Sequence, residues 1–274
     1  WSRLGVVADA MGARDEARAH YRMALELDPE CVEAHFNMGI SLREQGDLTG
    51  AIGSYRRALA VNPTQADVLF NLGRAQQADG DVAAAEVSYR ASISVDPNKV
   101  AAQNNLGTVL LDQGQLSDAV DVYRQAAGED SAGSVHANSA WNLSLALLLS
   151  GNYEEGWRWY EWRFYKGGAT PPTFDKPRWH LDAPADARVL VWAEQGYGDA
   201  MQFVRYVPMV KARAATVILN IHPNLRRLLD GFGGAVTVAP GEDMPEYDFH
   251  IAMLSLPGLF GTTVDSVPAN IPYF

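Results

Sequence analysis

The sequence has almost no cysteine and no long apolar run. Its single cysteine, Cys31, cannot form an internal disulfide, so nothing in the chain indicates an oxidising compartment. No stretch reaches the roughly 18 uncharged apolar residues of a membrane-spanning helix. The first residues also lack the basic and apolar regions of an export signal. We therefore expect a cytoplasmic location and no insertion into a membrane.

Basic residues are scarce as well. Lys and Arg total 22 against 33 Asp and Glu, which gives a formal net charge of -11. A surface this acidic disfavours general binding to nucleic acid or to anionic membranes, so neither is expected as a partner. At 274 residues, 47% of them hydrophobic, the chain is long enough for two domains with apolar cores.

Several catalytic motifs are missing. Gly196 and Gly198 match the first two glycines of the dinucleotide-binding fingerprint, but Met201 stands where the third would be. The chain has no Walker sequence, no Gly-x-Ser-x-Gly elbow, and no metal-ligand spacing of His, Cys or carboxylates. We therefore expect no metal and no cofactor bound by this chain.

What the chain does have is a repeat of 34 residues, marked by a glycine at one phase of each unit. An alanine follows this glycine after twelve positions, and a tyrosine follows the alanine after four. The residues are Gly5, Ala17 and Tyr21; Gly39, Ala51 and Tyr55; Gly73, Ala85 and Tyr89; Gly107, Ala119 and Tyr123. This period and content are typical of tetratricopeptide repeats, which are stacked pairs of antiparallel helices. The sequence therefore predicts an all-α superhelix of about five units, the first of them incomplete.

The fifth unit departs from the pattern. It starts 37 rather than 34 residues after the fourth, and its second half is rich in aromatic residues. Helical spacing accounts for Trp157, Tyr160 and Phe164 as the core of a hairpin. It does not account for Trp159 and Trp162, which we expect to contact the following domain because large apolar patches mark interfaces.

An asparagine recurs beside the repeated glycine, at Asn37, Asn71, Asn105 and Asn142. First helices line the concave surface of such superhelices, so the four amides are expected to form a column whose donors and acceptors match an extended peptide backbone. Phe36, Phe70, Asn104 and Trp141 precede them and are expected to pack against side chains of a bound segment. The alternative, that each amide bonds only a neighbouring helix, stays open. The column resembles the asparagine ladder of the O-linked N-acetylglucosamine transferase superhelix, which holds acceptor polypeptides; Arg3 replaces the amide in the first unit.

The composition changes after residue 165. Residues 166–187 are rich in Gly and Pro and are predicted to be a linker, with Trp179 as an anchor onto a domain surface. Short apolar runs then alternate with helical patterns, and strands are predicted at 189–193, 216–221, 235–238 and 249–253. The sequence therefore predicts tetratricopeptide repeats over 1–165 and a small Rossmann-like α/β domain with a mainly parallel sheet over 188–274.

The segment after the first predicted strand carries candidate site residues. Ligands bind at the carboxyl ends of parallel strands, and the residues expected there are Gln195, Gly196, Gly198 and Asp199, with Gln202 and Arg205 lining the same cleft. Asp199 has the chemistry of a general base. It is equally suited to cap the helix that follows, and the residues leave both roles open. His222 and His250, single histidines near strand ends, are expected to be structural.

The sequence AEQGYGDAMQFVRY at 193–206, with Leu254 to Pro257 and Ile271 to Tyr273, resembles a family of bacterial proteins. Its members join tetratricopeptide repeats to a glycosyltransferase of the GT-B arrangement, related to the heptosyltransferases. The resemblance implies that 188–274 is the acceptor side of the active site and that Asp199 deprotonates the acceptor hydroxyl. It also implies a nucleotide sugar as donor for the full-length protein, held by a second domain after Phe274.

Two functional hypotheses follow. In the first, the chain is a fragment of a repeat-linked glycosyltransferase, inactive by itself, whose repeats bind a protein or polymer acceptor. In the second, it is a non-catalytic protein-interaction scaffold with a degenerate transferase-like cap. Because Trp1 already lies at the fourth position of a repeat, we also expect further repeats upstream.

Overall fold

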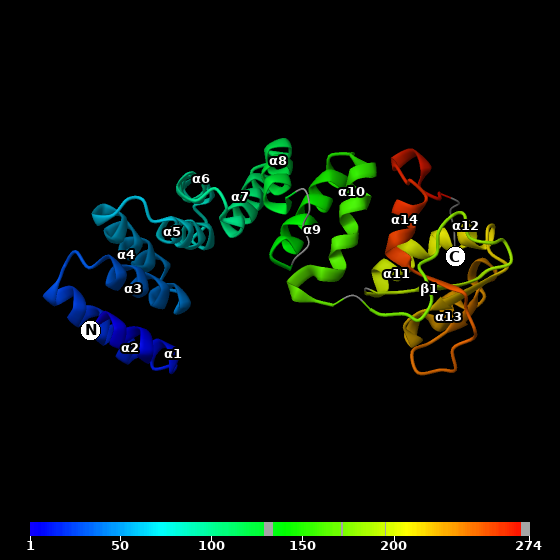
Figure 1. The fold of residues 1–274 in the computed structure, drawn as a ribbon, viewed down its shortest axis with the longest axis horizontal. Coiled ribbons are helices and arrows are strands. Elements are labelled where there is room, and N and C mark those ends of the chain that lie inside the picture. The colour runs from blue at the N-terminus through cyan, green and yellow to red at the C-terminus, as the bar shows by residue number, and fades with distance from the viewer. Residues whose placement is uncertain (129–133, 171, 195, 270–274) are drawn as a thin grey trace. The chain divides into compact units, whose positions relative to one another are not determined.

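The chain folds into two compact units, Trp1–Ala146 and Leu147–Phe274. The computed structural model describes residues 1–128, 134–170, 172–194 and 196–269. The first unit is built from helices, and the second adds a parallel sheet (Figure 1). The boundary falls inside the expected fifth repeat rather than after residue 165. Within the described ranges, no helix has the length and apolar character needed to cross a bilayer.

The first unit is a series of helical hairpins. Its elements are α1 (Ser2–Ala10), α2 (Arg14–Leu27), α3 (Val32–Glu44), α4 (Leu48–Val61), α5 (Ala66–Ala78), α6 (Val82–Val95), α7 (Val100–Asp112), α8 (Leu116–Ala127) and α9 (Ser134–Leu149), the last of which crosses the boundary between the units. Odd and even helices pair in sequence, and α2, α4 and α6 also pack on the first helix of the next pair (Figure 1). This arrangement confirms the predicted tetratricopeptide superhelix.

The repeated glycine and tyrosine explain how each hairpin closes. A Cβ atom on Gly39 would lie 2.5 Å from Cε1 of Tyr55, far inside normal contact distance. The ring therefore packs directly on the backbone of the first helix, and it is fully buried there. The same approach joins Gly5 to Tyr21, Gly73 to Tyr89 and Gly107 to Tyr123. A glycine is needed at this phase because any side chain would occupy the space of the ring.

The four tyrosine hydroxyls, in contrast, have different surroundings. The hydroxyl of Tyr21 donates to Asp9 at 2.7 Å and that of Tyr89 to Gln77 at 2.9 Å. Tyr123 and Thr108 share a hydrogen bond of 3.0 Å. The hydroxyl of Tyr55 is buried without a hydrogen-bond partner among the described residues. The ring contact is thus common to the repeats, whereas the polar contact is particular to each.

The sheet of the second unit contains β1 (Arg188–Trp192), β2 (Thr216–Asn220), β3 (Val236–Val238) and β4 (Phe249–Ala252). Its order is β3-β2-β1-β4, and every pair is parallel. These bounds confirm the four predicted strands to within one residue at each end. The chain leaves β1 towards β2 and β3 and then returns to the other side of β1 as β4. The order therefore reverses between β1 and β4, the position in parallel sheets where ligands commonly bind.

The helix after β1 differs from the expectation. It begins at Tyr197 and is divided into α11 (Tyr197–Phe203), η2 (Val204–Tyr206) and α12 (Val207–Lys211). Gly196 is its N-cap, with extended backbone angles, and Asp199 is the third helical residue. No side chain caps this helix. The interpretation of Asp199 as the N-cap is therefore wrong, because the chain enters the helix three residues earlier.

Short helical segments complete the second unit. They are α10 (Tyr153–Tyr160), η1 (Glu161–Gly168), η3 (Pro223–Leu225), α13 (Arg226–Leu229), η4 (Phe232–Gly234), η5 (Met253–Ser255), α14 (Leu256–Leu259) and η6 (Val264–Ser266). Trp179, expected as a surface anchor, is buried in the main core of this unit with the side chains of Val189 and Val191. Its backbone N–H donates to the carbonyl of His250 at 2.8 Å, so the predicted linker extends the edge of the sheet beside β4.

Helix α10 packs on the α/β part of its own unit, which explains where the boundary falls. The indole N–H of Trp157 donates to the carbonyl of Thr262 at 2.8 Å, and Tyr160 packs against the main core. The sequence placed such a contact on Trp159 and Trp162. The contacts are made instead by Trp157 and Tyr160, which helical spacing had assigned to the core of the hairpin.

Candidate functional site

The four predicted asparagines lie on α3, α5, α7 and α9, and all four are half-buried. Three of them donate one hydrogen bond within the protein: Asn71 to the carbonyl of Asp67 at 2.9 Å, Asn105 to the hydroxyl of Tyr89 at 3.3 Å and Asn142 to the side-chain carbonyl of Asn104 at 2.9 Å. Asn37 has no hydrogen-bond partner among the described residues. The alternative of bonds to neighbouring groups therefore accounts for part of the hydrogen-bonding capacity of the row.

The side-chain carbonyl groups of the four asparagines make up the hydrogen-bonding capacity that is not used within the protein. An asparagine amide offers two N–H donors and a carbonyl with two acceptor positions. Across the residues that the structure describes, no group donates to the side-chain carbonyl of any of the four. We call the surface that carries Asn37, Asn71, Asn105 and Asn142 the ladder face. It presents a row of unused acceptors on successive repeats.

Aromatic side chains flank the amides on the ladder face. The rings of Phe36 and Phe70 lie 6.1 Å and 6.0 Å from those of the buried Tyr55 and Tyr89, and both phenylalanines remain half-buried. Trp141 occupies the equivalent position on α9 and is also half-buried. These predicted contact residues therefore keep part of their apolar surface open beside the acceptors.

The carboxyl ends of β1 and β4 hold a buried ion pair that the sequence did not indicate. Arg163 donates through Nη2 to both carboxylate oxygens of Glu194, at 2.9 Å and 3.1 Å, and to the hydroxyl of Ser255 at 2.7 Å. Glu194 also accepts the backbone N–H of Leu254 at 3.2 Å. The two charged side chains are only 3% and 7% exposed. Together they tie η1 to the carboxyl ends of β1 and the neighbouring edge strand β4.

Burial and charge act against each other in this network. Burial raises the pKa of Glu194, and the guanidinium of Arg163 opposes that rise. Burial would also raise the pKa of Glu161, but Arg163 and Arg178 hold it below its usual value. The guanidinium of Arg163 lies 4.0 Å from the centre of the Phe164 ring, which shields it from water. Arg163 and Glu194 thus form the buried part of the network, whereas Glu161 and Arg178 are partly exposed.

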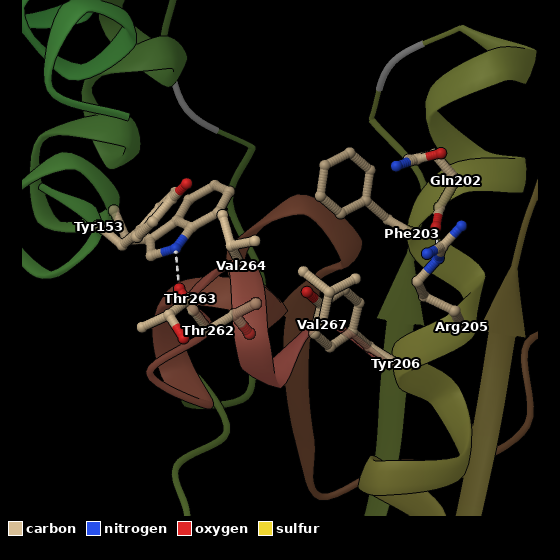
Figure 2. Close-up of a pocket in the computed structure, with 10 residues that line it drawn as sticks. Tyr153, Gln202, Phe203, Arg205, Tyr206, Thr262, Thr263, Val264 and Val267 are labelled. Carbon is tan, nitrogen blue, oxygen red and sulfur yellow. Dashed lines mark hydrogen bonds between the residues drawn. The ribbon is translucent and has the colours of Figure 1, made fainter. Parts of the chain in front are cut away.

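Two of the predicted cleft residues line one cavity. Gln202 and Arg205 line a cavity of about 250 Å³ between α10, α11 and the segment around η6. Figure 2 shows Tyr153 on one side of this cavity and Phe203 on the other, with Thr262 and Val264 among the residues that line it. Arg205 donates to the carbonyl of Gln202 at 2.9 Å. Asp199, three residues before Gln202 on α11, is not among the residues that line this cavity.

Asp199 lies in the first turn of α11, half-buried, while Gly196 and Gly198 are exposed at its start. Asp199 is close enough to Tyr160 to contribute to the raised pKa of that phenol, about 12, although burial is the main cause. Gln195 lies outside the described residues, as does the segment Ile271 to Tyr273. Asp199 therefore lies near the carboxyl end of β1, and Gln195, predicted for the same site, lies outside the described residues.

His250 in β4 and His222, two residues after β2, both take part in local hydrogen bonds. Nδ1 of His250 accepts from the indole of Trp192 at 3.3 Å, and burial lowers the pKa of this imidazole. His222 accepts the backbone N–H of Asn224 at 3.2 Å and lies 3.3 Å from the hydroxyl of Tyr197. Among the described residues, no three His, Cys, Asp or Glu side chains are grouped as ligands for a metal ion.

Comparisons with known proteins identify the repeats. Family models described as TPR or tetratricopeptide repeats match residues 1–31, 39–80 and 70–134. Together with the hairpins, they show that the first unit is made of tetratricopeptide repeats. The matching models end at residue 134, so the transferase identity of 188–274 stays a prediction. A search of curated proteins gave no match.

Solved structures show the same fold. The crystal structure of MamA has a TM-score of 0.53 and 22% identity, with 58% of this chain and 91% of that chain covered. PilF of Pseudomonas aeruginosa has a TM-score of 0.54 and 22% identity, covering 62% and 76%. YrrB, described as a TPR protein with an unusual peptide-binding site, has a TM-score of 0.52 and 18% identity, covering 59% and 82%. At these identities the likeness extends to the fold alone.

Proposed function

We propose that this tetratricopeptide-repeat chain binds an extended polypeptide segment along the ladder face. The observation that carries the proposal is the row of four asparagine carbonyls that accept no hydrogen bond from the described residues. Backbone N–H groups of an extended segment are suitable donors to such a row. Because tetratricopeptide repeats are typical of protein–protein interaction scaffolds, the fold supports the same function.

Two properties of the ladder face favour a polypeptide over a small molecule. The acceptors recur once per repeat, so they match a ligand that continues from one hairpin to the next. Phe36 and Phe70 lie next to them and provide half-open apolar surface for side chains of the segment. Amides would thus hold the backbone of the segment, and the aromatic rings would select among its side chains.

Replacing Asn71 and Asn105 together by alanine is expected to weaken peptide binding at least tenfold, because two contacts of about 1 kcal/mol each are lost. An array of 12-residue peptides would supply a binder, whose affinity is then measured by fluorescence anisotropy. The melting temperature should change little, since Tyr89 keeps its hydrogen bond to Gln77. Asn98→Ala is the matched control, because Asn98 is exposed and lies in the turn before α7.

Backbone methylation of the same peptide provides the second part of this test. N-methyl groups at alternate positions remove the donors and should abolish binding if the amides recognise the backbone. Unchanged affinity of both the methylated peptide and the Asn71→Ala, Asn105→Ala variant, combined with a large loss of stability, would assign the asparagines a structural role.

A second function rests on the sheet. We propose that the second unit forms the acceptor side of a sugar transferase, with Asp199 as the general base. Two features support this: the parallel order β3-β2-β1-β4, and the position of Asp199 in the first turn after β1. A carboxylate near the carboxyl ends of the strands is placed to accept a proton from an acceptor hydroxyl.

Asp199→Asn is expected to lower sugar transfer at least a hundredfold, because general bases contribute about that much or more. The assay uses the full-length product of the gene that encodes this chain, a panel of nucleotide sugars and a cell lysate, and it detects mass increases on intact proteins. Asp186→Asn, at an exposed loop position, is the control. Equal transfer by the wild type and the Asp199→Asn variant would remove this residue from the mechanism. If the wild type transfers no sugar but still binds peptides, the scaffold function stands alone.

A further inference from the structure

We infer that the segment bound by the ladder face carries acidic side chains, which contact Arg43 on α3 and Arg74 on α5. This inference rests on the proposed function and names the chemistry of the partner. The chain has a net charge of -11, and neither of the two arginines forms an ion pair with another of the described residues.

No carboxylate among the described residues lies within 4.0 Å of either guanidinium. Both side chains are half-buried, and Nε of Arg43 is fully enclosed without a hydrogen-bond partner in the described part of the chain. Burial raises the pKa of Tyr55, while the close approach of the Arg43 side chain and, to a smaller extent, the positive charge of Arg74 act against that rise. The two guanidinium groups therefore lie near the same phenol, although they come from adjacent repeats.

Position on the helices places both arginines beside the predicted contact residues. Arg74 follows Asn71 by three residues, and Arg43 follows Phe36 by seven, so each pair shares one helix face. The guanidinium of Arg74 also lies 5.6 Å from the centre of the Phe70 ring. An acidic side chain of the segment can therefore reach a guanidinium while a neighbouring apolar side chain packs on phenylalanine.

Nearby acidic residues of the protein do not compete for these arginines. Asp67 on α5 is paired with Lys99 at 2.5 Å, and Glu44 on α3 is paired with Arg14 at 3.2 Å. Glu33 lies ten residues before Arg43 on the same helix, which corresponds to about 15 Å along the axis. Lys99, whose ammonium also lies 5.6 Å from the centre of the Phe70 ring, is paired with Asp67, whereas the two guanidinium groups have no such partner among the described residues. Carboxylates are well-matched ligands for guanidinium groups.

The charge of the partner is tested with three labelled peptides of 12 residues, identical except that alternate positions carry Glu, Gln or Lys. Fluorescence anisotropy with the full chain at low salt is expected to show the Glu peptide binding about tenfold more tightly than the Gln peptide, and the Lys peptide more weakly than both. Two partly exposed ion pairs account for a factor of this size. Raising the salt concentration should remove the preference, because exposed charges are screened.

Matched variants identify the groups responsible. Arg43→Gln with Arg74→Gln should abolish the preference for Glu, whereas Arg56→Gln with Arg57→Gln on α4, at two exposed positions, should retain it. If the double glutamine variant proves unstable, Arg74→Lys is used as well. This variant keeps the charge and should retain most of the preference for the Glu peptide. Equal binding of the three peptides by the wild type overturns the acidic partner but keeps the proposed function. Preference that persists in the double glutamine variant overturns the assignment to Arg43 and Arg74. Failure of every peptide, including those of the array, to bind overturns the proposed function itself.

Discussion

Replacing Gly39 by valine is expected to destabilise the first unit by about 3 kcal/mol, at the upper end of the usual cost of overpacking. The first atom of the new side chain would lie 2.5 Å from the ring of Tyr55. That ring is fully buried, so it has no free space to enter. The hairpin of α3 and α4 must therefore open, and in a repeat array each hairpin supports its neighbours. Urea unfolding followed by circular dichroism measures the change.

A glycine in the next helix provides the control for this prediction. Gly53 lies within α4, where an added Cβ would meet no atom within 4 Å. Gly53→Ala should therefore raise the stability by about 0.5–1 kcal/mol, because alanine restricts the unfolded chain and favours helix. An unfolding midpoint of Gly39→Val equal to that of the wild type would show that the packing of glycine on tyrosine does not set the distance between the helices.

Replacing Arg163 by methionine is expected to destabilise the second unit by about 3–5 kcal/mol, because it leaves the carboxylate of Glu194 buried without its partner. Burial already raises the pKa of Glu194 above its value in an unfolded chain, and the variant should raise it further. A carboxyl group whose folded pKa is raised loses stability as pH rises through that range. The deficit of the variant should accordingly be smaller at low pH. The difference in unfolding free energy between the variant and the wild type is measured by tryptophan fluorescence during urea unfolding at several pH values.

Two further variants separate charge from packing. Arg163→Met combined with Glu194→Gln removes both charges and should recover most of the lost stability. Arg178→Met removes a half-exposed partner of Glu161, 2.6 Å away, and should cost less than about 1 kcal/mol. If Arg163→Met alone were as stable as the wild type at neutral pH, the ion pair would have no role in joining η1 to the sheet.

The repeats could be predicted from the sequence because their determinants are local. The spacing of sixteen residues between Gly39 and Tyr55 places both on one hairpin, so their contact does not depend on the rest of the chain. The strands could be located for a similar reason, since each is a short apolar run. These are the features in which the predicted and observed folds agree.

The contacts of the second unit could not be predicted in the same way. Arg163 is 31 residues from Glu194 and 92 from Ser255, and no periodicity relates them. Whether Asp199 caps α11 depends on where that helix begins. The extended backbone at Gly196 makes Tyr197 the first helical residue, which the residue types alone do not specify. The spacing of Gln202 and Arg205 likewise does not reveal that the cavity they line is completed by residues of α10 and the segment around η6.

The tyrosine hydroxyls give each hairpin an identity of its own. Asp9, Gln77 and Thr108 serve three of the phenols, and the hydroxyl of Tyr55 is enclosed without a partner in the described structure. Each of these three partners lies on the first helix of the hairpin that carries its tyrosine, so the second helices are not interchangeable, although their rings are alike. Moving one tyrosine-bearing helix to another place in the array would pair its hydroxyl with the wrong neighbour. Each of these polar contacts therefore matches the two helices of one hairpin to each other, in addition to the packing of ring on glycine that all four hairpins share.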